Sequence, residues 1–408
     1  MTYDVAATGK AASAARARAR TVPHVRIQGV DVLRGFALLG IVLINAQVMA
    51  GPHIGSGGRQ VVSSVDGVVA WLVTALVSGK FYLLFSFLFG YSFTLQRASA
   101  EREGAAFAPR HLRRMVCLFL IGVAHAVLLF RGDILMTYAA LSLVLFAARD
   151  TAPRTAVGVA SWLICGLGLF LLSRGLLTLA TVTTVPTDPH HVRSAAAGIE
   201  ETAVAYRGDP VSVVRANVRL LREALAGDVL YAPHMLAAFL AGLAAGRRGV
   251  LAAPGRYRAQ MKRVVRWGLP IGLAGGVFMA VCCDGPLDAR WSDVGLAAGV
   301  LTAPALTAAY VCGLLLLRTT RPGRRLGVVL APAGRMALTN YLTQSLVLAL
   351  VFTGYGLALY GRLGTATVLI GCCTLYGAQL ACSRWLMRRA RYGPVEWFLR
   401  TVTLARRP

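Results

Sequence analysis

Acidic residues are scarce in this chain: 17 Asp and Glu stand against 43 Lys and Arg in 408 residues, which gives a formal charge of +26. Charged residues make up only 15% of the sequence, whereas 56% of the residues are hydrophobic. Soluble domains carry about 25% charged residues, so this composition excludes an ordinary soluble domain. The basic excess does not indicate a nucleic-acid-binding protein either, because the arginines cluster in alternate gaps between long apolar stretches.

Several enzyme and metal-site signatures are also missing. The chain has no P-loop, no G-x-G-x-x-G on a strand–helix unit, no H-E-x-x-H and no G-x-S-x-G, which argues against ATP-driven transport by this chain alone. Its eight cysteines form no C-x-x-C and no mixed Cys/His spacing, and four of them are two vicinal pairs inside apolar stretches. We therefore expect no metal site.

What the chain does have is a regular series of apolar stretches. A hydrocarbon core about 30 Å thick needs about 20 apolar residues per helix, so the pattern predicts an all-α, polytopic transmembrane bundle of about ten spans. The basic clusters flank alternate spans, and the positive-inside bias then places both termini in the cytoplasm. The expected spans are residues 34–50, 80–96, 115–131, 134–148, 156–183, 230–246, 267–283, 293–317, 335–358 and 364–386.

The same pattern divides the chain into four parts. Residues 1–25 have no apolar core, and we expect a disordered basic tail there. Residues 26–183 form a first transmembrane bundle, in which 66–78 are amphipathic and are expected at the outer surface. Residues 184–229 are the one long hydrophilic stretch and predict an extracytoplasmic loop. Residues 230–408 then form a second transmembrane module with a basic tail.

Polar residues at the start of the first span require an explanation, because an ionisable group at the bilayer centre costs at least about 2.5 kcal/mol. Asp31 and Arg34 are three residues apart, one helical turn, so they can form an ion pair. The same face of the helix continues to Asn45, near the outer third. This stripe either binds a ligand or combines a juxtamembrane anchor with a hydrogen bond between helices.

His125 lies about 11 residues beyond the arginines at the inner end of its span, or roughly 16 Å into the membrane. Arg131 and Asp133 follow close to the outer boundary. Histidine exchanges a proton near neutral pH, and a carboxylate can orient it and stabilise its charged form. The sequence therefore predicts either a general base or proton relay here, or a buried histidine bonded to a helix carbonyl.

Three further polar residues leave two interpretations each, and a fourth, Arg335, carries one hypothesis. Lys80 opens an aromatic-rich span and either extends to the outer interface or binds an anion. Asn340 and Gln344 share one helix face, where amides either contact substrate or join helices. For Arg335, near the inner end of its span, our hypothesis is contact with a phosphate at the cytoplasmic surface.

Five blocks carry a resemblance that spans about residues 26 to 404. They are 29–41 (GVDVLRGFALLGI) with Asn45; Lys80-Phe81 with 88–90; 122–125 (GVAH) with 132–135 (GDIL) and Tyr138-Ala139; 334–342 (GRMALTNYL) with Gln344-Ser345; and 393–397 (GPVEW) with Arg400. Together they resemble the YeiB-like family of bacterial membrane proteins, whose C-terminal part is domain of unknown function 418. That family is distantly similar to transmembrane acyltransferases, which transfer an acyl group from cytosolic acyl-CoA to an acceptor at the membrane.

The resemblance implies an acyltransferase-like bundle with a polar cavity in the bacterial plasma membrane. Our hypothesis is a membrane-embedded enzyme that moves an acetyl or other acyl group from acyl-CoA, its co-substrate, to a hydroxyl or amine of a small-molecule or envelope acceptor. His125 would be the general base, and Asp133 would orient it. Arg131, Lys80, Asn45, Asn340 and Gln344 would contact substrate, and Asp31, Arg34 and Arg335 would meet the phosphates of acyl-CoA.

Two other classes stay open at this point. A secondary transporter or exporter of a small metabolite would use His125 and Asp133 as a proton relay. A non-catalytic scaffold or sensor would use the outer stretch 184–229. All three hypotheses have the lipid bilayer as a partner and none needs nucleic acid, while the acceptor, the acyl donor and the oligomeric state are left undetermined by the sequence.

Overall fold

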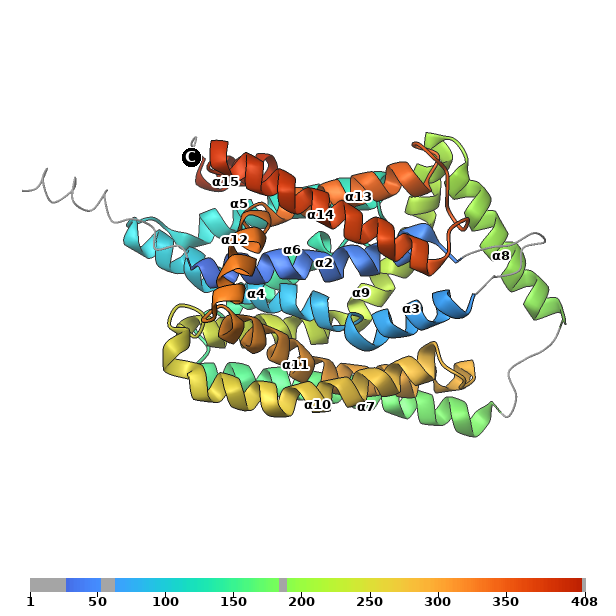
Figure 1. The fold of residues 1–408 in the computed structure, drawn as a ribbon, viewed down its shortest axis with the longest axis horizontal. Coiled ribbons are helices and arrows are strands. Elements are labelled where there is room, and N and C mark those ends of the chain that lie inside the picture. Colours follow the sequence, from blue (N-terminus) through green and yellow to red (C-terminus); the bar gives the residue numbers. More distant parts are fainter. Residues whose placement is uncertain (1–26, 53–62, 183–188, 406–408) are drawn as a thin grey trace, which may run out of the picture.

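In a computed structural model, residues 27–52, 63–182 and 189–405 are described, and this part of the chain is helical without a strand. The helices run along a common axis and form one bundle (Figure 1). The basic tail expected over residues 1–25 lies outside the described residues. The fold class predicted from the sequence, an all-α bundle, is confirmed.

Eight helical segments of the described chain are long and apolar enough to cross a membrane, which makes the protein a multi-pass membrane protein. Their bounds are Gln28–Ala50 (α2), Ser64–Arg102 (α3, Ser64–Leu76, and α4, Lys80–Arg102), Phe107–Leu128 (α5), Pro153–Thr181 (α7), Pro210–Arg247 (α9), Pro254–Cys283 (ending in α10, Arg258–Cys283), Ala289–Leu317 (ending in α11, Ser292–Leu317) and Thr365–Arg389 (α14). Two shorter apolar helices are Leu135–Ala147 (α6) and Ala337–Phe352 (α13). The remaining helices are Pro189–Arg207 (α8), Arg321–Arg335 (α12) and Pro394–Leu404 (α15).

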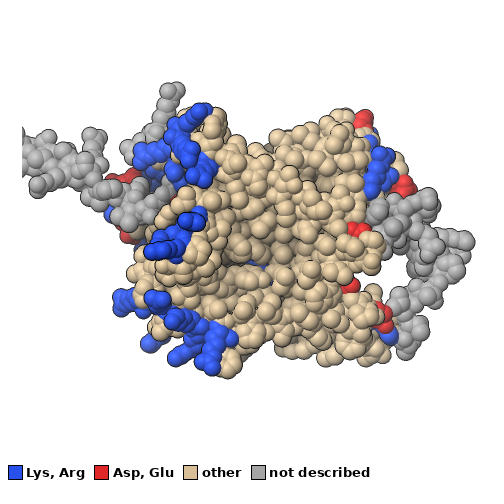
Figure 2. Space-filling model, in the orientation of Figure 1, with Lys and Arg blue, Asp and Glu red and all other residues tan. Residues whose placement is uncertain are grey.

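The two ends of the bundle differ in charge. Arg97 of α4 and Arg247 of α9 both pair with Asp150, which follows α6, so these helices meet at one end. The hydrogen bond from Arg97 holds the pKa of Asp150 below its usual value. Most visible Lys and Arg side chains gather at this basic end, an uncharged belt follows, and the opposite end carries a few acidic and basic side chains (Figure 2). This is the charge pattern of a membrane-spanning bundle.

The segment from α3 to α4 is broken over residues 77–79. Gly79 has a φ of +80°, a backbone conformation that residues with a Cβ rarely adopt. The expectation that residues 66–78 lie on the outer surface was wrong, because α3 packs alongside α10 and α14 within the bundle. A close approach to α10 explains this placement: a Cβ at Gly276 would lie 2.3 Å from the carbonyl oxygen of Ala75.

Most of the stretch expected to be an outer loop, 184–229, is helical, since it holds α8 and the first part of α9. Asp209 caps α9 by accepting a hydrogen bond from the backbone N–H of Ser212, and a proline follows at the first helical position. With 38 residues α9 is about 57 Å long, so it extends far beyond the predicted span. Arg207 of α8 donates to the carbonyl of Tyr360, which holds this segment over the linker between α13 and α14.

Candidate functional site

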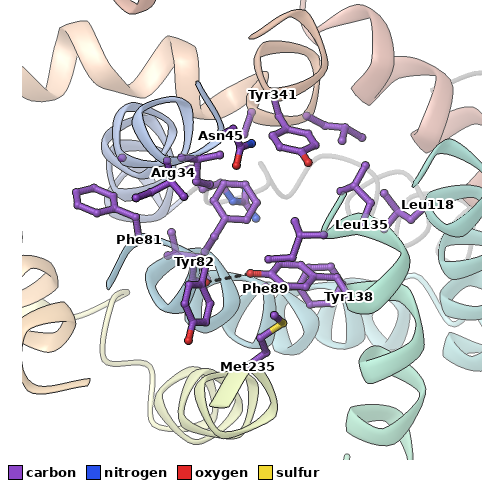
Figure 3. Close-up of a pocket in the computed structure, with 18 of the residues that line it drawn as sticks. Arg34, Asn45, Phe81, Tyr82, Phe89, Leu118, Leu135, Tyr138, Met235 and Tyr341 are labelled. Carbon is purple, nitrogen blue, oxygen red and sulfur yellow. Dashed lines mark hydrogen bonds between the residues drawn. The ribbon is translucent and has the colours of Figure 1, made fainter. Parts of the chain in front are cut away.

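A cavity of about 490 Å³ lies among α2, α4, α6, α9 and α13 (Figure 3). Residues from Phe81 to Gln96 of α4 contribute to its wall, so it extends roughly 23 Å along that helix at 1.5 Å per residue. This length approaches the thickness of a hydrocarbon core. The middle of the wall is apolar and aromatic, and includes Phe81, Phe85, Leu88, Phe89, Leu118, Leu135 and Met235.

The end of the cavity nearest the basic end is lined by Arg34, Arg114 and Arg335. Arg34 donates a 2.5 Å hydrogen bond to Ser92 of α4, and its guanidinium lies 3.8 Å from the carboxylate of Asp31, so the predicted ion pair is confirmed. Asp31 itself is 4% exposed and does not line the cavity. Nε of Arg114 is buried and has no hydrogen-bond partner among the described residues, and the charge of Arg114 interacts with those of Arg34 and Glu396.

Glu396 of α15 is the carboxylate that lines the cavity beside these arginines. Its Oε1 accepts hydrogen bonds from the backbone N–H groups of Leu338 (2.7 Å) and Thr339 (3.0 Å), and its Oε2 accepts one from the Thr339 hydroxyl (2.6 Å). This carboxylate therefore caps the N-terminus of α13, just after the break between α12 and α13 at Met336. Both oxygens of Glu396 are thus engaged by α13, and three guanidinium groups line the cavity beside it.

The far end of the cavity carries neutral polar groups and one further carboxylate. The Tyr138 hydroxyl donates to the carbonyl of Tyr82 (3.0 Å), the contact drawn in Figure 3. Asp228 of α9 accepts a 2.5 Å hydrogen bond from the hydroxyl of Thr137. Asn45 lines the cavity and lies beside Tyr341 in Figure 3, so the structure places this predicted residue at the site.

The structure brings His125 and Asp133 together as the sequence predicted. Nδ1 of His125 lies 2.8 Å from Oδ1 of Asp133, and both side chains are 1% exposed. Oδ2 of Asp133 accepts a hydrogen bond from the backbone N–H of Met136, and the Tyr341 hydroxyl donates to Oδ1 at 3.4 Å. Nε2 of His125 is buried and has no hydrogen-bond partner among the described residues. Hydrogen bonds therefore fix both members of the pair, and Nε2 is the ring nitrogen that no described residue bonds.

This pair lies in a wall between two cavities. Neither His125 nor Asp133 lines the arginine-ended cavity, but the neighbours Gly132 and Ile134 do, as does Tyr341, whose ring centroid is 5.0 Å from that of His125. Arg131 instead lines a second cavity of about 510 Å³. Arg131 donates to the Tyr206 hydroxyl (2.8 Å) at the end of the bundle opposite the basic end. One short loop therefore separates the two cavities.

Asn340 and Gln344 line neither cavity, and their contacts are those of residues that join helices. Asn340 donates to the carbonyl of Ala333 (3.1 Å) and to Ser383 of α14 (3.0 Å). Gln344 donates to Gln379 (2.8 Å), which in turn donates to the carbonyl of Asn340 (3.0 Å). This buried network connects α12, α13 and α14, so the geometry favours packing over substrate contact.

Lys80 does not extend to the outer interface, so that interpretation was wrong. Its side chain is fully buried at the start of α4, and Nζ donates to the carbonyl of Thr74 at 3.0 Å. The reason is the turn at Gly79, which folds the lysine back against the last turn of α3. Lys80 lines neither of the two cavities described above, so it is not placed to hold a ligand in them.

Sequence reasoning missed four residues of the site. Arg114 was hidden in a cluster of arginines that flanks a span, and Asp228 lay in the stretch read as a loop. Tyr341 and Glu396 stood inside the blocks that carry the family resemblance, but spacing alone gives no indication that Tyr341 meets Asp133 or that Glu396 caps α13. These contacts join residues that are distant in sequence, so only the three-dimensional structure reveals them.

These features define a multi-pass helical membrane protein with a long amphipathic cavity and a buried His–Asp pair. Residues 245–406 match the model of a family described as "Protein of unknown function (DUF418)". The chain is 30% identical over 396 residues to "Uncharacterized protein YxaH" of Bacillus subtilis, covering 94% of this chain and 95% of that one. It is 27% identical over 384 residues to "Uncharacterized protein YeiB" of Escherichia coli, covering 92% and 95%. The chain belongs to this YeiB-like DUF418 family.

Proposed function

We propose that the protein is a membrane-embedded acyltransferase that uses acyl-CoA as its donor. The observation that carries the proposal is the chemical gradient of the cavity. Three arginines line one end of the cavity, and its middle is apolar and aromatic. The far end lies beside the loop that carries Asp133, the partner of His125. A donor with phosphates at one end and a slender acyl-bearing arm at the other matches that gradient.

The proposed topology places the basic end in the cytoplasm of a bacterial cell, where acyl-CoA is found. The short helices α6 and α13, of 13 and 16 residues, join the eight longer segments to give ten crossings of the plasma membrane. Both termini of the described chain then face the cytoplasm. Arg34, Arg114 and Arg335 meet the donor from that side, because guanidinium groups bind phosphate oxygens in a bidentate manner.

The His–Asp pair supplies the proton chemistry in this proposal. Asp133 accepts a hydrogen bond from Nδ1–H of His125, which leaves the Nε2 lone pair to remove a proton from the acceptor as it attacks the thioester carbon. The carbon–sulfur bond then breaks, and the departing thiolate takes up a proton. Nε2 is buried and Tyr341 lies between the His125 ring and the cavity, so movement of the Tyr341 side chain would open the path to it.

Binding of acyl-CoA to the purified protein tests the donor half of this proposal. A site of about 10 µM affinity adds roughly 2.7 kcal/mol of stability at 1 mM ligand, which gives a clear thermal shift. Arg114→Gln removes a cavity guanidinium whose Nε has no hydrogen-bond partner among the described residues, so we expect affinity to fall about tenfold, or 1.4 kcal/mol.

Arg113→Gln is the matched control, because this neighbouring arginine is exposed and donates to the carbonyl of Pro109 instead of lining the cavity. ATP and free CoA serve as ligand controls. An absence of any shift with acetyl-CoA and longer acyl-CoAs would contradict the proposal, as would equal losses in the two variants.

A secondary transporter is the second candidate, and the cavity lined by Arg131 favours it. Two cavities separated by a buried His–Asp pair are also the arrangement expected of a proton-coupled carrier. Protein reconstituted in liposomes would then show a pH-dependent flux that His125→Ala removes, without acyl chemistry. Thioester-dependent stabilisation together with product formation decides against this candidate.

A further inference from the structure

Asp228 is a carboxylate on the candidate membrane-spanning helix α9, next to its apolar part, and no ion pair neutralises it among the residues that the structure describes. It belongs to the face of α9 that lines the arginine-ended cavity, together with Gly227, Tyr231 and Met235. An ionised group in such a position is costly, and it is retained where it binds or moves something. Among the described residues, only the hydroxyl of Thr137 donates a hydrogen bond to Asp228.

That hydroxyl fixes the carboxylate in place. Thr137 donates to Oδ2 of Asp228 at 2.5 Å, whereas no described residue bonds to Oδ1. Thr137 stands four residues after Asp133, about one turn further along the chain, and the charges of the two aspartates are close enough to interact. The beginning of α6 therefore positions both the His125–Asp133 pair and the carboxylate that faces the cavity.

The charges along the cavity are segregated. Arg34, Arg114 and Arg335 line one end, while the other end carries Asp228, with Glu223 at its exposed rim and no lysine or arginine among its described lining residues. Tyr82, Tyr138 and Asn45 add neutral polar groups to this far end (Figure 3). A carboxylate surrounded by apolar walls attracts a cation far more strongly than one in water does.

We propose that the acceptor of the transferred acyl group is a primary amine, held as its ammonium ion by Asp228. This inference rests on the acyltransferase proposal. An alcohol would leave the charge of the carboxylate uncompensated in the cavity, whereas an ammonium group balances it and donates up to three hydrogen bonds. The acceptor class is therefore set by Asp228, and the product is an amide rather than an ester.

The chemistry balances without a further reactant. The ammonium gives one proton to Nε2 of His125, and the resulting amine nitrogen attacks the thioester carbon. A carbon–nitrogen bond forms, the carbon–sulfur bond breaks, and the second nitrogen proton passes to the thiolate. Acyl-CoA and an ammonium ion thus yield an amide, free CoA thiol and one proton, which His125 releases to solvent. Asp228 stays ionised throughout and holds the nitrogen.

The test compares phenethylamine with phenethyl alcohol, two probes of nearly equal size that differ in the terminal group. Binding to the full chain in lipid nanodiscs is measured by titration calorimetry, with empty nanodiscs subtracted. We expect the wild-type protein to prefer the amine at least tenfold, which corresponds to 1.4 kcal/mol. Asp228→Asn keeps an acceptor for Thr137 but removes the charge, and is expected to abolish the preference.

Glu201→Gln is the matched control, because this exposed carboxylate of α8 pairs with Arg219 of α9 and lines neither cavity, so the preference should stay nearly unchanged. Acetyl-CoA binding, measured on the same samples, shows that each variant is folded. Three results would each overturn the inference: equal binding of amine and alcohol, no binding of the amine, or an amine preference that survives in Asp228→Asn. Donor binding would still support the acyltransferase in each case. Loss of donor binding in the wild type together with an Asp228-dependent amine preference would overturn the acyltransferase and identify the amine as cargo.

Discussion

Replacing His125 by alanine is expected to lower acyl transfer by about 10²–10⁴-fold while leaving acyl-CoA binding unchanged. The variant removes the Nε2 lone pair that accepts the acceptor's proton, but it alters none of the arginines that line the cavity. Transfer is measured by mass spectrometry of the acylated product, and donor binding by thermal shift on the same preparation. Loss of turnover with intact donor binding would separate the chemical step from substrate capture.

His111→Gln is the control for this experiment. His111 is also buried, but it lies near the basic end, where its ring stacks on Phe146 and Nε2 contacts Ser142. It lines neither cavity, so transfer per folded molecule should stay close to that of the wild type. The assignment of His125 as the general base would be contradicted if His125→Ala kept its activity. It would also be contradicted if activity fell equally in both variants.

The His125–Asp133 pair was predictable because the evidence for it is local in sequence. The helix that carries His125 ends at Leu128, and a short turn brings Asp133 back to the preceding helical turn. The ion pair of Asp31 and Arg34 was predictable for the same reason, since i and i+3 residues share a helix face. In both cases the separation along the chain is at most eight residues.

Other parts of the site depend on packing between distant segments. The buried position of Lys80 follows from the break at Gly79 and from the approach of α3 to α10. Sequence periodicity reveals neither of these features. Asp228 was assigned to a loop because its neighbours are hydrophilic, yet α9 continues through them as one helix of 38 residues. Hydrophobic periodicity identifies helices that face lipid, but it does not show which polar face encloses a cavity.

The amides of Asn340 and Gln344 show a further limit. Their spacing correctly placed both on one face of a helix, but a face that joins α14 and a face that binds a substrate have the same sequence pattern. Only the hydrogen bonds to Ser383 and Gln379 distinguish the two roles. Composition and charge thus predict the class of fold well, whereas the cavity and its lining follow from tertiary contacts.

Gly334→Ala is expected to destabilise the protein by about 3 kcal/mol, at the upper end of the usual cost of overpacking. A Cβ at Gly334 would lie 1.7 Å from the carbonyl oxygen of Asp31, and one at Gly35 would lie 2.2 Å from that of Leu330, so α2 and α12 touch through their backbones. Neither backbone can yield without moving a helix. The effect is measured as the midpoint of thermal unfolding in detergent.

The same substitution should also weaken acyl-CoA binding, because α2 and α12 carry Arg34 and Arg335 into the cavity. Gly377→Ala in α14 is the matched control: nothing lies within 4 Å of a Cβ at that position, so stability should change by no more than about 1 kcal/mol. If the two variants unfold at the same temperature, α2 and α12 do not meet in this way. If Gly334→Ala is unstable but its remaining folded fraction binds acyl-CoA as the wild type does, the contact stabilises the bundle without positioning the two arginines.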